Sequence, residues 1–122
     1  MSVQPIVKGF WDEPTGSWQY VFHDPATMQG AIVDPVWNFD PLAAATTTES
    51  ADEIEAHVRA QGIEIVSILD THPHADHFSA ARVLQKRLGG QTAIGAEVTA
   101  VQALWKELYH FGDDFPTDGR YW

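Results

Sequence analysis

Cysteine is absent from this chain of 122 residues. That absence excludes a disulfide framework, a thiolate zinc site and a cysteine nucleophile. Any metal ion must therefore be held by histidine and carboxylate side chains. Any redox chemistry must come from a bound cofactor, because the chain has no thiol of its own to oxidise.

Basic residues are scarce, since seven Lys and Arg stand against 17 Asp and Glu and the formal net charge is -10. Binding to phosphates depends on clustered positive charge, so this balance disfavours nucleic acid and anionic membrane surfaces as partners. Long hydrophobic runs are also missing, and no stretch approaches the ~20 apolar residues of a membrane-spanning helix. The N-terminus lacks the apolar core of a secretory signal. We expect a soluble, cytoplasmic protein.

The residues that are present have the composition of a globular protein. Hydrophobic residues make up 44% and charged residues 20%, an ordinary balance for a folded chain, and the length allows a single domain at 1–122. Residues 18–23 alternate Trp, Tyr and Phe with Gln, Val and His, which is the period of a half-buried strand. A turn at 24–27 and a return strand at 30–33 follow, and tryptophan side chains are expected to anchor the core.

The hydrophobic period changes in the middle of the chain. Residues 36–49, rich in Pro, Ala and Thr, are expected to form an exposed loop. Ser50 and Glu53 have the spacing of a capping box, which predicts a helix that begins at Ser50 and ends at Gly62. The nearly continuous apolar run at 63–69 predicts a strand buried on both faces, as in a sheet covered by helices.

Helix and strand signals alternate in the remaining third. A helix over 80–88 is followed by two glycines, a short strand at 92–94 and a third helix with apolar residues from Val98 to Leu108. This order predicts an α/β fold in which helices pack on a mixed sheet. The tail ends on aromatic residues, so we expect a domain truncated at its C-terminus. Its unfinished sheet edge would favour a homo-oligomer.

Four potential metal ligands follow the apolar strand within six residues: His72, His74, Asp76 and His77. Residues two apart in extended backbone point the same way, so the first two can hold one ion, and the last two, on the following turn, can face a second. Imidazole and carboxylate without thiolate are typical of catalytic zinc, iron or manganese sites. The alternative, a polar surface loop, does not explain so many ligands at the end of a buried strand.

The segment from Thr71 to His77 resembles the T-H-x-H-x-D-H signature of the metallo-β-lactamase fold superfamily. Other segments are similar to one branch of that superfamily, the group near glyoxalase II and the persulfide dioxygenases. They lie at 16–21, 24–27, 31–36, 78–81, 88–90 and 94–96. The resemblance covers essentially the whole chain but only the first half of a family domain. It implies the N-terminal half of an αββα sandwich.

The resemblance also implies roles for individual residues. In dinuclear members the positions of His72 and His74 bind the first metal ion, and those of Asp76 and His77 bind the second. Asp76 is also placed to handle the proton of the attacking water, which makes it the implied catalytic residue. In the mononuclear iron branch fewer of these positions bind metal, and His72 is the most secure ligand.

Two further residues resemble positions that orient the ligands, a support that metal sites generally require. They are Asp34 and Thr71, although a turn residue before proline explains Asp34 equally well. The family supplies a further His, a bridging Asp and a last His from later strands, which would lie beyond residue 122. His110 is the sole histidine after the motif. It is a weak substitute ligand, because a position near a helix end, where the dipole favours a cation, explains it as well.

Two classes of function follow from the resemblance. The first is a metal-dependent enzyme acting on a small thiol-derived substrate that contains glutathione. One Fe²⁺ would support persulfide oxidation, which the N-terminal segments favour, and a dinuclear site, for example with Zn²⁺, would hydrolyse a thioester. The second class is non-catalytic: a truncated metal-binding fragment, or a half-domain that needs a partner chain.

Overall fold

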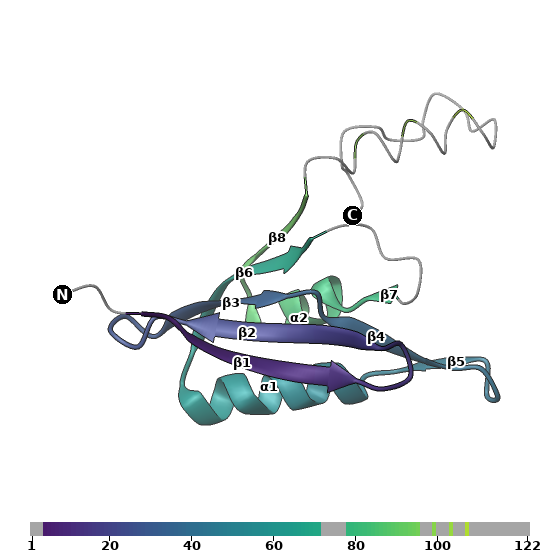
Figure 1. The fold of residues 1–122 in the computed structure, drawn as a ribbon, viewed down its shortest axis with the longest axis horizontal. Helices are drawn as coiled ribbons and strands as arrows, with labels where there is room; N and C mark the ends of the chain where they lie inside the picture. Colours follow the sequence, from purple (N-terminus) through teal and green to yellow (C-terminus); the bar gives the residue numbers. More distant parts are fainter. Residues whose placement is uncertain (1–3, 72–77, 96–98, 100–102, 104–106, 108–122) are drawn as a thin grey trace.

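The computed structural model describes residues 4–71 and 78–95, together with positions 99, 103 and 107 (Figure 1). In chain order its elements are β1 (Ile6–Asp12), β2 (Ser17–His23), β3 (Gln29–Val33), β4 (Val36–Asp40), β5 (Ala45–Thr47), α1 (Glu49–Gln61), β6 (Glu64–Asp70), β7 (Phe78–Ser79), α2 (Ala81–Leu88) and β8 (Gln91–Ile94). Five strands form one sheet in the order β1-β2-β3-β6-β8, and three form a smaller sheet in the order β5-β4-β7.

Strand directions in the large sheet are mixed, as the sequence predicts. The neighbours β1, β2 and β3 run antiparallel, whereas β3, β6 and β8 run parallel to one another. Parallel neighbours need a crossover connection, and the helices α1 and α2 lie in the two crossovers. The C-terminal ends of β3, β6 and β8 therefore meet at one edge of the sheet. The predicted metal ligands follow β6 at that edge.

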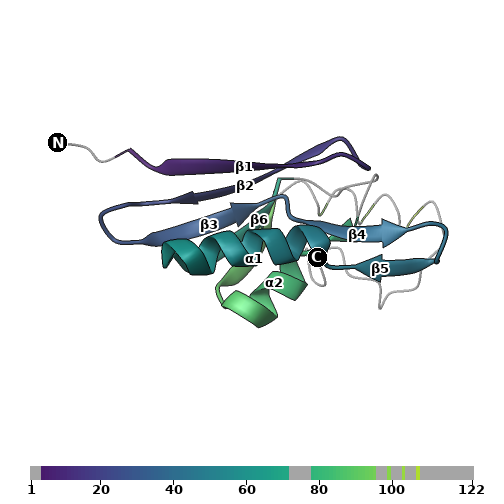
Figure 2. The same ribbon diagram turned by 90° about the horizontal axis from the view of Figure 1, so that it is seen from below.

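Both helices pack on the same face of the large sheet (Figure 2). Ile54 and Val58 lie four residues apart on α1, so both project from one stripe of the helix into the core, as predicted. The largest fully buried apolar side chains come from sheet and helices alike: Val21, Ile32, Val36, Ile54, Ile68 and Leu84. Each such side chain stabilises the fold by about 1.5–3 kcal/mol relative to its exposed state.

The opposite face of the large sheet carries exposed aromatic side chains. Trp11 and Trp18 are 51% and 52% exposed, with ring centroids 5.2 Å apart, and Trp18 stacks on Tyr20 at 6.2 Å. The alternation predicted at 18–23 is confirmed, but its buried side is the one that holds Val21. The expectation that tryptophan anchors the core is wrong for these two residues, because the described helices cover only the other face.

The strand β6 is buried on one face only. Ile65 and Ile68 are buried, whereas Val66 is 42% exposed. The prediction of a strand buried on both faces is therefore wrong for the described part of the chain. A continuous apolar run indicates that both faces can be covered, and the described helices cover one of them.

The prediction of an exposed loop at 36–49 is wrong, because β4 and β5 form a hairpin there. Long-range contacts that the local composition does not encode hold β4 in place. The Val36 N–H donates to Gln19 Oε1 at 2.9 Å, and β4 pairs with β7. Val36 is fully buried as a result.

Helix α1 starts at Glu49 and has no capping box. Ser50 lies inside the helix, where its Oγ donates to Asp12 Oδ1 at 3.2 Å. Asn38 Oδ1 accepts the Ser50 N–H at 2.8 Å, so a side chain of β4 satisfies a backbone donor that a local cap would otherwise take. The end at Gly62 is confirmed, with φ of 69°, a left-handed conformation that glycine adopts without strain.

The helix and strand predicted near 80–94 correspond to α2 and β8. Positions 99, 103 and 107 are helical. The apolar residues predicted for the third helix lie outside the described residues: Val98, Val101, Leu104, Trp105 and Leu108. Among the described helices, none has the length and apolar character needed to cross a membrane.

Candidate metal centre

The predicted ligands stand between two elements whose positions are known. β6 ends at Asp70, and β7 begins at Phe78. The ligands themselves lie outside the described residues, as does the alternative ligand: His72, His74, Asp76, His77 and His110. Their roles stay predictions. The described residues show how the chain is held immediately before and after the motif.

Thr71, the residue before the first predicted ligand, is bound by the carboxylate of Asp34. Its backbone N–H donates to Asp34 Oδ1 at 2.8 Å. Its hydroxyl donates to Asp34 Oδ2 at 2.9 Å and lies 3.2 Å from Oδ1. A charged acceptor makes these bonds stronger than neutral ones. The structure thus brings together Asp34 and Thr71, the two residues that resemble positions orienting the ligands.

Asp34 is also the turn residue between β3 and β4. Its φ is 54°, a left-handed conformation that Asp adopts more readily than most residues because its short side chain can bond locally. Its own N–H donates to the Leu69 carbonyl at 2.7 Å, which continues the pairing of β3 with β6. The two interpretations of Asp34 are therefore compatible, since one residue makes the turn and bonds Thr71.

The end of β8 also contacts this edge. The Gly95 N–H donates to the Asp70 carbonyl at 3.1 Å. A Cβ built at Gly95 would lie 2.5 Å from the Thr71 carbonyl oxygen, a distance at which the backbone would have to shift. A glycine is required here because the backbone passes so close to Thr71. Thr71 is thus in contact with the turn after β3 and with the residue that follows β8.

Two functional candidates at this edge were missed by sequence reasoning. Asp70 is buried, with 5% exposure, and Ser79 Oγ donates to its Oδ2 at 2.7 Å. The available signal was the charge itself, because Asp70 ends a run of apolar residues that a buried strand would be expected to continue. The bond spans the motif, since Asp70 precedes it and Ser79 follows it.

The chemistry of this edge suits a divalent cation. The motif offers three imidazoles and a carboxylate, the donors that Fe²⁺ and Zn²⁺ accept in sites without thiolate. Asp34 and Asp70 add two carboxylates to the same edge of the sheet, and negative charge nearby favours a bound cation. Hydrogen-bonded partners behind the ligands are the usual way in which proteins fix ligand orientation.

Elsewhere in the described part of the chain, no group of three or more His, Asp or Glu side chains is arranged to hold a metal ion. His23 is buried, at 5% exposure. The pKa of His57 is lowered by partial burial and by the nearby charges of Lys8 and His23. Its ring packs edge-on against Phe10, with centroids 5.6 Å apart. His57 thus contributes to the packing of α1 against β1.

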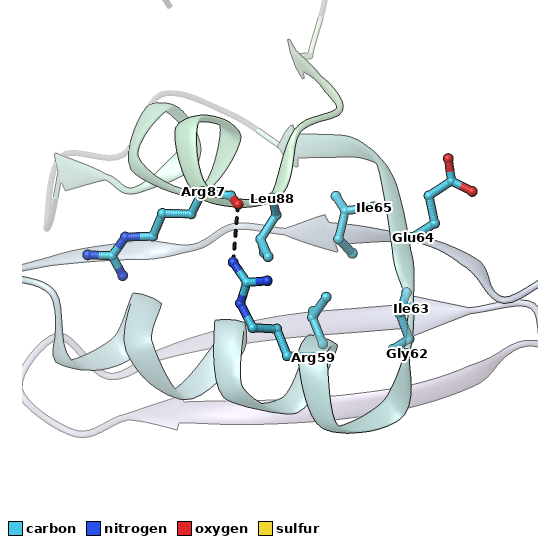
Figure 3. Close-up of a pocket in the computed structure, with 8 residues that line it drawn as sticks. Arg59, Gly62, Ile63, Glu64, Ile65, Arg87 and Leu88 are labelled. Carbon is cyan, nitrogen blue, oxygen red and sulfur yellow. Dashed lines mark hydrogen bonds between the residues drawn. The ribbon is translucent and has the colours of Figure 1, made fainter.

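A cavity of about 470 Å³ lies at the other end of β6, near Glu64 (Figure 3). Its floor is apolar, with Ile63, Ile65 and Leu88, and Arg59 reaches across it to the Arg87 carbonyl. Six residues of extended strand separate this end from Asp70, about 20 Å at the usual rise. The cavity is therefore remote from the candidate metal centre.

No family model matches the chain. Among curated relatives, a β-lactamase hydrolase-like protein of Agrobacterium fabrum is 53% identical over 97% of this chain and 27% of its own length. A probable metallo-hydrolase of Burkholderia pseudomallei is 42% identical, over 93% of this chain and 38% of its own. The mitochondrial persulfide dioxygenase ETHE1 of Bos taurus is 21% identical, over 82% and 35%. The chain thus spans about a quarter to two-fifths of the length of these relatives.

Solved structures have the same fold over part of their length. ETHE1 of Myxococcus xanthus superposes with a TM-score of 0.60 and 26% identity, over 71% of this chain and 34% of that one. A metallo-β-lactamase of Staphylococcus aureus gives a TM-score of 0.61 with 21% identity, over 80% and 25%. The chain therefore has the metallo-β-lactamase fold over part of a family domain, and it is similar to the matching parts of metallo-hydrolases and of persulfide dioxygenases.

Proposed function

We propose that this chain carries the metal-binding part of an enzyme that oxidises a glutathione-type persulfide with a mononuclear Fe²⁺. The observation that supports the proposal most is the anchoring of Thr71 by Asp34 directly before the H-x-H-x-D-H motif. The similarity to ETHE1 of Myxococcus xanthus, at 26% identity, also supports this activity.

The residues of the chain have distinct roles in this proposal. His72 is the first ligand, with His74, Asp76 and His77 available for the rest of the site. When bound, Fe²⁺ would activate dioxygen. This activation is needed because dioxygen by itself reacts slowly with closed-shell organic substrates. The chain supplies the remaining functions: orientation of the ligands by the edge of the sheet, and a carboxylate at Asp76 that can accept or donate a proton.

The proposed reaction is balanced with water and dioxygen as the other substrates. One persulfide, one dioxygen and one water give one thiol and one sulfurous acid, which ionises to sulfite. The terminal sulfur loses four electrons and its bond to the neighbouring sulfur, and dioxygen takes up the four electrons. No oxidant other than dioxygen is required.

Thioester hydrolysis is the second candidate. The 42% identity to a probable metallo-hydrolase favours it. In this case His72 and His74 would hold one Zn²⁺, and Asp76 and His77 a second. Two bound ions would supply a nucleophile by lowering the pKa of water, and Asp76 would accept the proton of the attacking water. The product would be a carboxylate and free glutathione.

A third candidate is non-catalytic. In this candidate the later ligands that the resemblance implies would come from a partner chain. Two or three protein ligands bind a metal more weakly than a closed site does. In this case the chain would be a metal-binding half-domain.

Two parallel assays separate these candidates. The protein is loaded anaerobically with Fe²⁺ or with Zn²⁺, and each form is given glutathione persulfide with dioxygen, or a glutathione thioester. We expect dioxygen uptake and sulfite from the Fe²⁺ form alone, and none from a His72→Ala variant. Thioester hydrolysis by the Zn²⁺ form without any dioxygen uptake would replace the first candidate with the second. Weak metal binding with neither reaction would favour the half-domain.

A further inference from the structure

The segment that holds the predicted ligands is bracketed by one hydrogen bond. Asp70 is the last residue of β6, and Ser79 is the last residue of β7. Ser79 Oγ donates to Asp70 Oδ2 at 2.7 Å, the length of a strong bond from a hydroxyl to a carboxylate. The two residues are nine positions apart, so the bond closes a short loop of chain that contains the whole motif.

Ser79 is held from the other side by the fold. Its Oγ accepts the Ala81 N–H at 3.1 Å, at the start of α2. Its backbone pairs with Val36 of β4, and the Ala80 N–H donates to the Pro35 carbonyl at 3.0 Å. The Ser79 hydroxyl therefore links the first turn of α2 to the end of β6, using its single donor and one acceptor site.

Asp70 is equally fixed. It pairs with Ile94 of β8, and its carbonyl accepts the Gly95 N–H. Asp70 has 5% exposure, and burial of an ionised group costs several kcal/mol unless hydrogen bonds offset it. An apolar residue would complete the core at lower cost at this position. A buried carboxylate bonded to Ser79 is explained if the distance between the two ends of the motif matters.

We propose that the Asp70–Ser79 hydrogen bond is a positioning contact for the metal site: it sets the separation of the two ends of segment 72–77 and so raises the affinity of that segment for a divalent cation. Ser79 and Asp70 touch no metal in this proposal and act through the ligands between them. The inference rests on the proposed function in one respect, namely that segment 72–77 supplies the ligands.

The test uses the full chain and Co²⁺ alone, because the visible absorption of Co²⁺ reports ligand number and geometry directly. Ser79→Ala removes the bond, and we expect the Kd for Co²⁺ to rise by about tenfold, the lower end of the range for residues that support metal ligands. Ser79→Thr keeps a hydroxyl on the strand and should restore the affinity to within about threefold of wild type. Unfolding by urea without metal measures stability in parallel.

Ser50→Ala is the matched control. It also removes a serine–carboxylate bond, from Ser50 Oγ to Asp12 Oδ1 at 3.2 Å, but in α1 and away from the motif. We expect it to lower stability by an amount similar to Ser79→Ala and to leave the Kd for Co²⁺ unchanged. A general loss of stability would weaken Co²⁺ binding in both variants, which would overturn the proposal.

Asp70→Ala removes the same bond and keeps the Ser79–Ala81 hydrogen bond at the start of α2. This variant therefore still tests the proposal if Ser79→Ala fails to fold. The double variant Ser79→Ala/Asp70→Ala should bind Co²⁺ about tenfold more weakly than wild type, as each single variant does. The effects do not add, because the two changes remove the same interaction. A hundredfold loss in the double variant, or an unchanged Kd in the single ones, would overturn the positioning role alone. A wild-type chain that binds no Co²⁺ would overturn the proposed function, and this inference with it.

Discussion

Thr71 is bound to Asp34, 37 positions earlier in the chain, through both its backbone N–H and its hydroxyl. The bond joins the turn after β3 to the end of β6. It fixes the residue from which the predicted ligands start. The same aspartate holds a left-handed φ of 54°, so the turn and the anchor depend on one residue.

Replacement of Asp34 should separate these two roles. Asp34→Ala removes the acceptor for Thr71 and puts a poorly suited residue at positive φ, so we expect a loss of about 2–3 kcal/mol in the free energy of unfolding. Asp34→Asn keeps an acceptor oxygen and tolerates positive φ, and should cost about half as much. Urea denaturation of the metal-free chain measures both. A loss below about 0.5 kcal/mol in the alanine variant would show that the anchor is unimportant.

Asp12 should be a larger determinant of stability than its place at a strand end suggests. It has 5% exposure, and its carboxylate accepts bonds from Asn38 Nδ2 at 3.1 Å and from Ser50 Oγ, which join β1, β4 and α1. Asp12→Ala leaves these donors unpaired and should cost about 2–4 kcal/mol in thermal or urea unfolding. Glu13→Ala, at the exposed neighbouring position, is the control and should change stability by less than about 0.5 kcal/mol. Equal effects of the two changes would refute the structural role of Asp12.

Acidification should destabilise the fold through His57. Its pKa is lowered from 6.5 by partial burial and by Lys8 and His23, so the unfolded chain binds a proton at His57 before the folded chain does. The resulting stability is present above pH 6.5 and is lost as the pH falls through the lowered folded pKa. We expect the urea midpoint to drop between pH 7.5 and 5.5, and to drop less in His57→Gln. Parallel pH profiles for the two proteins would contradict this assignment.

The exposed aromatic face should make the chain self-associate. Trp11, Trp18 and Tyr20 form a contiguous aromatic surface on β1 and β2, and apolar patches of this kind mark association sites. Sedimentation across micromolar concentrations should show oligomers, and Trp18→Ser should reduce them. Leu42→Ser removes a side chain that is 98% exposed in the turn between β4 and β5, and it should not reduce association. A wild-type chain that sediments as a monomer throughout this range would rule out such association.

The sequence predicted those elements that depend on interactions between residues close together in the chain. The alternation at 18–23, the helix face with Ile54 and Val58, and the stop at Gly62 all appear as expected, because each depends on backbone period or on a single positive φ. Contacts between distant segments were not predictable. β4 lies in a stretch of loop-like composition and is held by Gln19 and β7, and Ser50 bonds Asp12 instead of its own helix.

The candidate site was predicted in part for the same reason. The ligands fall within six residues of sequence, so their spacing alone suggests a metal site. Asp34 and Thr71 were named from the resemblance to the family, and their bond shows that they lie together. The position of Asp70 at the end of an apolar run is a signal of its burial, but no local signal indicates its bond to Ser79, because the return of the chain at β7 cannot be read from composition.

The central claim is that the H-x-H-x-D-H segment binds a divalent metal ion. Elemental analysis of the chain, purified anaerobically without chelator, tests it most directly when the double variant His72→Ala/His74→Ala is measured beside wild type. We predict that wild type carries bound iron or zinc, that the double variant carries none above background, and that far-UV circular dichroism is largely unchanged. Equal metal content in the two proteins would contradict the assignment of the motif.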